Sequence, residues 1–171
     1  KFWNASYNVA GAFIADPAER AATYPPVESG GFQANPDTSY LLTPTSLAYG
    51  RLLTVSGKMP TFPKTLPESR RWSPRKYQVR YWSLCQNESP VTTRVSGCLY
   101  DEQVPTDDEG RYTIVLGRPE DRPDNATDEC GVAWLDWGPG DGVSRETAGT
   151  LLLRNMLPAD DFAAAIQRVD A

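Results

Sequence analysis

The chain has 171 residues, of which 40% are hydrophobic and 23% charged, and it contains 15 Pro and 13 Gly. This length suits one domain with its own core, and so many turn-forming residues exclude a fold dominated by long helices. The net charge is −5, and the basic residues are dispersed apart from a short cluster over 70–76. We therefore expect no nucleic-acid partner, because neutralising phosphates requires a concentrated cationic face.

Two short helices are expected within residues 1–30. Asp16 can cap the second of them, with Pro17 at its first helical position. The first is indicated by apolar residues at steps of three and four, the spacing of one helix face: Trp3, Tyr7, Ala10 and Ile14.

Short apolar or alternating segments follow between residues 31 and 158, and turn residues separate them. They predict seven strands, over 39–43, 51–56, 77–85, 92–100, 112–116, 132–137 and 150–157. A parallel α/β fold needs helices between its strands, and no segment here has that pattern. The sequence therefore predicts an antiparallel β-sandwich or jelly roll within one domain spanning 1–171.

A last helix is predicted over 159–171. Asp160 or Asp161 can cap it. Its apolar stripe, formed by Phe162, Ile166 and Val169, would cover a face or edge of the sandwich.

Several short motifs occur in a fixed order along the chain. They are Asn35-Pro36-Asp37-Thr38-Ser39-Tyr40, Gly50-Arg51-Leu52-Leu53-Thr54-Val55, Arg80-Tyr81-Trp82-Ser83-Leu84, Ala133-Trp134-Leu135 and Leu152-Leu153-Arg154. As a set they resemble uncharacterised bacterial jelly-roll domains, often exported, that carry N-x-D-T-x-Y, Y-W-S, N-W-L-P and a final L-R strand. Here Ala133 and Asp136 stand where those domains usually have Asn and Pro. The resemblance implies a fold and an envelope location, but it supplies no catalytic residues, because that group has no established activity.

The three cysteines are Cys85, Cys98 and Cys130. They form no C-x-x-C pair and no histidine accompanies them, so we expect no metal site. An odd number allows at most one intramolecular disulfide, and exported domains tend to form one. We predict Cys98–Cys130, because Cys98 lies in a predicted strand and Cys130 directly precedes another. Three buried thiols are the alternative.

The sequence contains no histidine, which removes the commonest general base and the commonest metal ligand. Ser-His-Asp, Cys-His and His-zinc sites are therefore excluded. Nucleophile-elbow, Walker-type and dinucleotide-binding motifs are also absent, and we expect no cofactor. A pair of carboxylates remains able to hydrolyse glycosides. Asp136, between Leu135 and Trp137 in a strand-like segment, is the acidic residue of most interest.

A candidate ligand-binding surface combines Arg80, Trp82, Asp136 and Trp137. Arg80 and Trp82 share one face of a regular strand, because side chains two apart point the same way. Trp137 adjoins a Gly-Pro-Gly turn, where loops gather. In the alternative interpretation Trp82 packs in the core and a carboxylate such as Asp136 satisfies Arg80.

These observations favour a non-catalytic, secreted or envelope-associated binding or interaction module. Its partner would be a carbohydrate, a lipid or a protein. The alternative is a carbohydrate-active hydrolase or lyase that uses carboxylates, or Tyr and Arg, without histidine. No apolar segment is long enough for a transmembrane segment, and the start at Lys1, without Met, is typical of a processed end.

Overall fold

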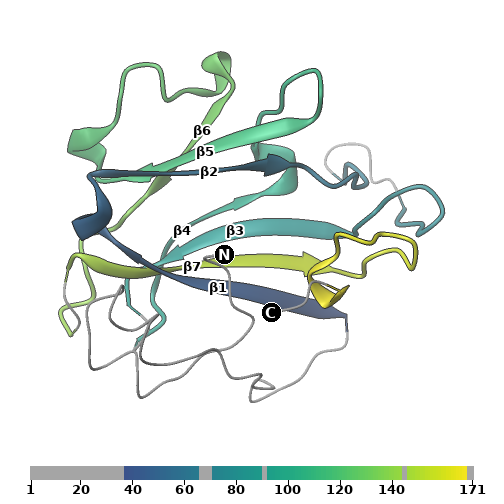
Figure 1. The fold of residues 1–171 in the computed structure, drawn as a ribbon, viewed down its shortest axis with the longest axis horizontal. Coiled ribbons are helices and arrows are strands. Elements are labelled where there is room, and N and C mark those ends of the chain that lie inside the picture. Colours follow the sequence, from purple (N-terminus) through teal and green to yellow (C-terminus); the bar gives the residue numbers. More distant parts are fainter. Residues whose placement is uncertain (1–36, 66–70, 90–91, 144–145, 169–171) are drawn as a thin grey trace.

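The computed structural model describes residues 37–65, 71–89, 92–143 and 146–168. The helices expected within 1–30 lie outside these ranges. The described chain forms two β-sheets that face each other as layers (Figure 1). Their strands are β1 (Thr38–Ser46), β2 (Leu52–Lys58), β3 (Tyr81–Asn87), β4 (Val95–Tyr100), β5 (Arg111–Gly117), β6 (Val132–Asp136) and β7 (Ala148–Met156). Each overlaps one predicted strand, so the mainly β prediction is confirmed.

Helical structure among the described residues is limited to short 3-10 helices. They are η1 (Leu47–Tyr49), η2 (Asp101–Gln103), η3 (Pro119–Asp121), η4 (Asp128–Cys130) and η5 (Ile166–Arg168). The helix predicted over 159–171 is not formed in its described part. Phe162, Ala165 and Arg168 each donate a backbone N–H to the carbonyl three residues earlier, so this segment makes successive tight turns instead of an α-helix.

The first sheet has the order β1-β7-β3-β4 and is antiparallel throughout. The second has the order β2-β5-β6, in which β2 and β5 are antiparallel and β5 and β6 are parallel. The expectation of an entirely antiparallel sandwich is therefore wrong at β5–β6. Parallel neighbours need a crossover of about a dozen residues or more, and the segment 118–131 supplies it. The turn residues of this segment are compatible with an antiparallel return as well as with a parallel crossover, so the sequence does not distinguish the two connections.

The core lies between the two sheets, where alternate residues of each strand point inward. In β5 the buried side chains are Tyr112, Ile114 and Leu116. Opposite them, Trp82 of β3 packs on Tyr112 with ring centroids 5.3 Å apart and planes inclined at 56°. This offset, tilted contact is favourable for two aromatic rings and joins the two layers.

The disulfide joins Cys85 to Cys98, and Cys130 is a free, exposed thiol. The predicted Cys98–Cys130 bridge is therefore wrong. Cys85 and Cys98 are direct partners in the β3–β4 register, with Cα atoms 4.1 Å apart, whereas Cys130 ends η4 beside the other sheet. The sequence indicates a hairpin here but not its register, and the register decides which cysteines face each other.

Candidate functional site

The two tryptophans of the predicted surface are both buried between the sheets. Trp82 is 4% exposed and Trp137 is 1% exposed. The Trp137 indole Nε1 donates a hydrogen bond to the Glu146 carbonyl, at 2.9 Å, and its ring belongs to the core. Neither ring offers a surface for a ligand, so the alternative interpretation, with Trp82 in the core, describes the structure.

Arg80 and Asp136 lie at opposite ends of β3. Arg80 immediately precedes this strand. At its other end, Ser96 Oγ lies 3.1 Å from the carbonyl oxygens of both Gln86 and Asp136, so its hydroxyl can donate to either. A strand advances about 3.3 Å per residue, which separates the two positions by roughly 20 Å. The predicted four residues are therefore not brought together, and Asp136 is the only exposed one among them.

The carboxylate close to Arg80 is Asp101, a buried residue of η2. Its two oxygens accept backbone hydrogen bonds from Trp82 and Glu102, both at 2.9 Å. Desolvation raises the pKa of Asp101 from 3.8 to about 6, against the opposing effect of these hydrogen bonds and of the Arg80 charge. The Asp101 carboxylate thus fixes the start of β3 through the Trp82 N–H.

Asp101 should give the protein a recognisable pH dependence. Between pH 3.8 and about 6 the folded protein keeps the Asp101 proton, whereas the unfolded chain releases it. The Asp101 contribution to the free energy of unfolding is complete below pH 3.8 and is lost as the pH rises through about 6. Asp101→Asn should remove that decline. Urea unfolding of both proteins from about pH 4 to 7 measures this decline. If the difference in free energy of unfolding between wild type and Asp101→Asn stays constant with pH, the prediction is contradicted.

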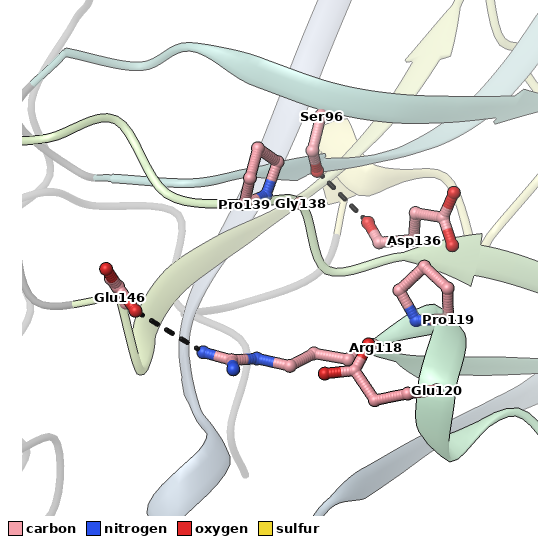
Figure 2. Close-up of a pocket in the computed structure, with 8 residues that line it drawn as sticks. All are labelled: Ser96, Arg118, Pro119, Glu120, Asp136, Gly138, Pro139 and Glu146. Carbon is pink, nitrogen blue, oxygen red and sulfur yellow. Dashed lines mark hydrogen bonds and ion pairs between the residues drawn. The ribbon is translucent and has the colours of Figure 1, made fainter.

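A polar pocket of about 330 Å³ lies where β5 and β6 end (Figure 2). Its lining residues are Ser96, Arg118, Pro119, Glu120, Asp136, Gly138, Pro139 and Glu146. Figure 2 shows Arg118 extended toward Glu146, to which its Nη2 is 3.8 Å away. The carboxylate of Asp136 accepts a hydrogen bond from Trp134 Nε1 at 2.6 Å. Three carboxylates and one guanidinium could hydrogen-bond a hydroxylated ligand.

One wall of this polar pocket is fixed by the buried carboxylate of Glu88. This carboxylate accepts the Gly140 N–H at 3.0 Å and lies 3.2 Å from Arg94 Nε. Gly138, with φ of +89°, has no room for a side chain, since its Cβ would collide with Glu88 and lie 2.6 Å from Ser96 Cβ. The turn that borders the pocket is therefore tightly held.

A larger, mainly apolar cleft of about 580 Å³ opens between the edge strands β1 and β2. Each of these strands lies at the edge of its own sheet, and η1 connects them at one end (Figure 1). The cleft is lined by Thr43, Pro44, Thr45, Tyr49, Leu53, Thr54, Val55, Ser56 and Leu151. None of these described lining residues carries a charge.

The cleft contains a buried polar group without a partner. Thr45 is 5% exposed, and its Oγ1 makes no hydrogen bond. Gln86, which is completely buried, likewise leaves its Oε1 without a partner. The two side chains converge over Gly149, where an added Cβ would collide with Gln86 Nε2 and lie 3.0 Å from Thr45 Oγ1. Most buried polar groups in proteins are hydrogen-bonded, so this pair requires an explanation.

Sequence reasoning did not identify this cleft. Residues 51–56 were predicted as a strand, but their alternation of apolar residues with Thr and Ser is ordinary for a half-buried strand. Nothing in it shows that the strand lies at a sheet edge beside another edge. The one signal was composition, since this segment alternates Leu53 and Val55 with small hydroxyl residues and no charge from 52 to 57.

The described ranges, 37–65, 71–89, 92–143 and 146–168, lack two further features. No group of three or more His, Cys, Asp or Glu side chains there is arranged to hold a metal ion. No helix in those ranges combines the length and apolar character needed to cross a membrane.

Comparison with known proteins gives structural neighbours but no family. No protein-family model matches the chain, and no curated protein matches it. An uncharacterised protein from Burkholderia cenocepacia has a TM-score of 0.43 and 18% identity, over 74% of this chain and 28% of that one. The VPA0106 protein from Vibrio parahaemolyticus has a TM-score of 0.49 and 14% identity, over 90% of this chain and 33% of that one. The chain thus spans a third or less of the length of these neighbours. The comparison with them indicates no activity for this chain.

Proposed function

We propose that this chain is a binding module that holds a small, mainly apolar ligand in the cleft between β1 and β2. The observation that carries the proposal is the cleft itself, about 580 Å³ in volume with walls from both sheets. Ligand sites usually enclose about 300–1,000 Å³, are mostly apolar, and contain a few placed polar groups. Leu53, Val55 and Leu151 supply the apolar area here, and the threonines supply the polar groups.

Binding is favoured over catalysis by the chemistry of the lining. The described residues around the cleft include no carboxylate, thiol, amine or guanidinium. Acid–base and nucleophilic catalysis commonly rely on such groups. The hydroxyls of Thr and Ser are weak acids and bases unless a neighbouring base activates them.

The alternative, a carbohydrate-active enzyme, would use the polar pocket of Figure 2. Glu120, Asp136 and Glu146 place three carboxylates around it. A glycosidase needs one carboxyl group that stays protonated, which usually requires shielding from water. The Glu146 side chain is 71% exposed and faces Arg118, and Asp136 is exposed. This activity stays a prediction, with weaker support than binding in the cleft.

The proposal also includes export of the protein and a relationship of its fold to jelly rolls. The Cys85–Cys98 disulfide supports an oxidising compartment, because cytosolic proteins rarely keep such bonds. The chain passes repeatedly between the two layers, from β1 to β2, from β2 to β3, from β4 to β5 and from β6 to β7. Repeated crossing between two sheets is typical of jelly rolls and supports that relationship.

Filling the cleft with a larger side chain should weaken binding. Val55 points toward the cleft from β2, whereas Val115 of β5 is opposite Thr54 and points to the outer face of the same sheet. We expect the neutral apolar dye N-phenyl-1-naphthylamine to bind the wild type saturably. Val55→Phe should weaken binding at least about tenfold, equivalent to about 1.4 kcal/mol.

The matched control is Val115→Phe, which adds the same volume outside the cleft and should keep wild-type affinity. Circular dichroism confirms that both variants are folded. Absence of saturable dye binding by the wild type, or equal loss in both variants, would overturn the proposal.

A further inference from the structure

We infer that the ligand of this cleft is a neutral lipid-like molecule whose hydroxyl or carbonyl group hydrogen-bonds to Thr45. This inference rests on the proposed binding function and adds the chemical class of the ligand. Two features carry it: the uncharged lining and the unpartnered hydroxyl of Thr45.

The lining indicates a ligand without charge. Among the described residues that border the cleft there is no Lys, Arg, Asp or Glu. Transferring an ion from water into such a site is strongly unfavourable unless a counter-charge compensates it. A fatty acid anion or a cationic amphiphile would therefore be disfavoured relative to a neutral molecule with the same chain.

Thr45 supplies the group that selects for a hydrogen-bonding head. It lies on the inward side of β1, and its Oγ1 is buried without a partner. A hydroxyl both donates and accepts, so it can bond either a carbonyl or a hydroxyl of the ligand. The unpartnered amide oxygen of Gln86 lies behind it and continues the polar region into the core.

Polar and apolar side chains both line the cleft. Thr43 is the register partner of Leu151, and Thr45 is the partner of Gly149, two residues nearer to η1. Leu151 on one sheet and Leu53 and Val55 on the other supply apolar area. The head of an amphipathic ligand is therefore assigned to Thr45 and its chain to these apolar side chains.

The first test compares headgroups on one chain length, using monodecanoylglycerol, decanoate and decyltrimethylammonium at pH 7.5. Each competes with N-phenyl-1-naphthylamine for the wild-type protein. We expect monodecanoylglycerol to displace the dye at a concentration at least about tenfold lower than either ion, which corresponds to about 1.4 kcal/mol.

The second test replaces the hydroxyl of Thr45 by a methyl group of similar size. Thr45→Val should weaken the binding of monodecanoylglycerol about three- to tenfold, because one hydrogen bond to the ligand is lost, and should leave the affinity for the dye unchanged. It should also raise the melting temperature of the unliganded protein by about 2–4 °C, because a buried unpartnered hydroxyl is removed. Thr113→Val, on the outer face of β5 and outside the cleft lining, is the matched control and should change neither the monodecanoylglycerol affinity nor the melting temperature.

The outcomes separate the two proposals. Equal displacement by all three amphiphiles, or unchanged monodecanoylglycerol affinity in Thr45→Val, overturns the neutral-headgroup inference while binding in the cleft stands. If neither the dye nor any amphiphile binds the wild type, the binding function itself is overturned. Selective binding of the neutral molecule that is weakened by Thr45→Val and not by Thr113→Val supports both.

Discussion

Trp82→Ala is expected to lower the free energy of unfolding by about 3–5 kcal/mol, the cost of deleting a large buried aromatic side chain. Trp82 is 4% exposed and contacts Tyr112 across the core with ring centroids 5.3 Å apart. Removing the indole leaves a cavity between two sheets that cannot close without distorting both. Urea unfolding at constant pH measures the loss, with the slope of the transition checked for two-state behaviour.

Trp134→Ala is the control for this measurement. Its half-buried ring lies on the outer face of the second sheet, with the guanidinium carbon of Arg122 5.3 Å from the ring centroid. Removing it leaves no core cavity, so a loss of about 1 kcal/mol is expected. Equal losses from the two substitutions would show that Trp82 does not have the core role assigned to it.

Removing the Cys85–Cys98 disulfide should lower the free energy of unfolding by about 3 kcal/mol, mainly because the unfolded chain regains freedom. The two cysteines are 13 positions apart and face each other in adjacent strands. The Cys85→Ala, Cys98→Ala double variant should unfold at a lower denaturant concentration than the oxidised wild type. Adding a reductant to the wild type should give the same shift.

Cys130→Ser is the matched control, since Cys130 is exposed and unbridged. It should keep the wild-type stability and the wild-type response to reductant. Peptide mapping under non-reducing conditions should recover Cys85 linked to Cys98. Recovery of Cys130 in a disulfide of the monomer, or a double variant as stable as the oxidised protein, would contradict this pairing.

The sequence predicted the strands well because strand formation depends on local pattern. In β2, for example, exposure alternates residue by residue along Leu52–Lys58, which the apolar and hydroxyl residues of that segment already indicated. The alternation shows that a strand has two different faces. It does not show which face points to the core, and for β3 both faces carry aromatic or apolar residues.

That ambiguity explains why the four residues of the predicted binding surface do not lie together. The strand pattern predicts Trp82 and Arg80 together on an open face, but Trp82 is in the core and the Arg80 charge acts on the buried Asp101. Asp136 is an exposed strand-end residue that lines a polar pocket together with residues from other segments, such as Ser96 and Arg118. No local pattern brings Ser96, Arg118 and Glu146 together.

The sequence by itself determined the strand positions, the absence of histidine chemistry and the presence of at most one disulfide, because each depends on residue types or on short-range periodicity. Only the tertiary structure decided the parallel β5–β6 pairing, the Cys85–Cys98 bridge and the cleft. These depend on register and on which strands become sheet edges. Thr45 lies opposite Gly149 only because β1 pairs with β7, a strand far away in the sequence, and the packing of the whole core sets that pairing.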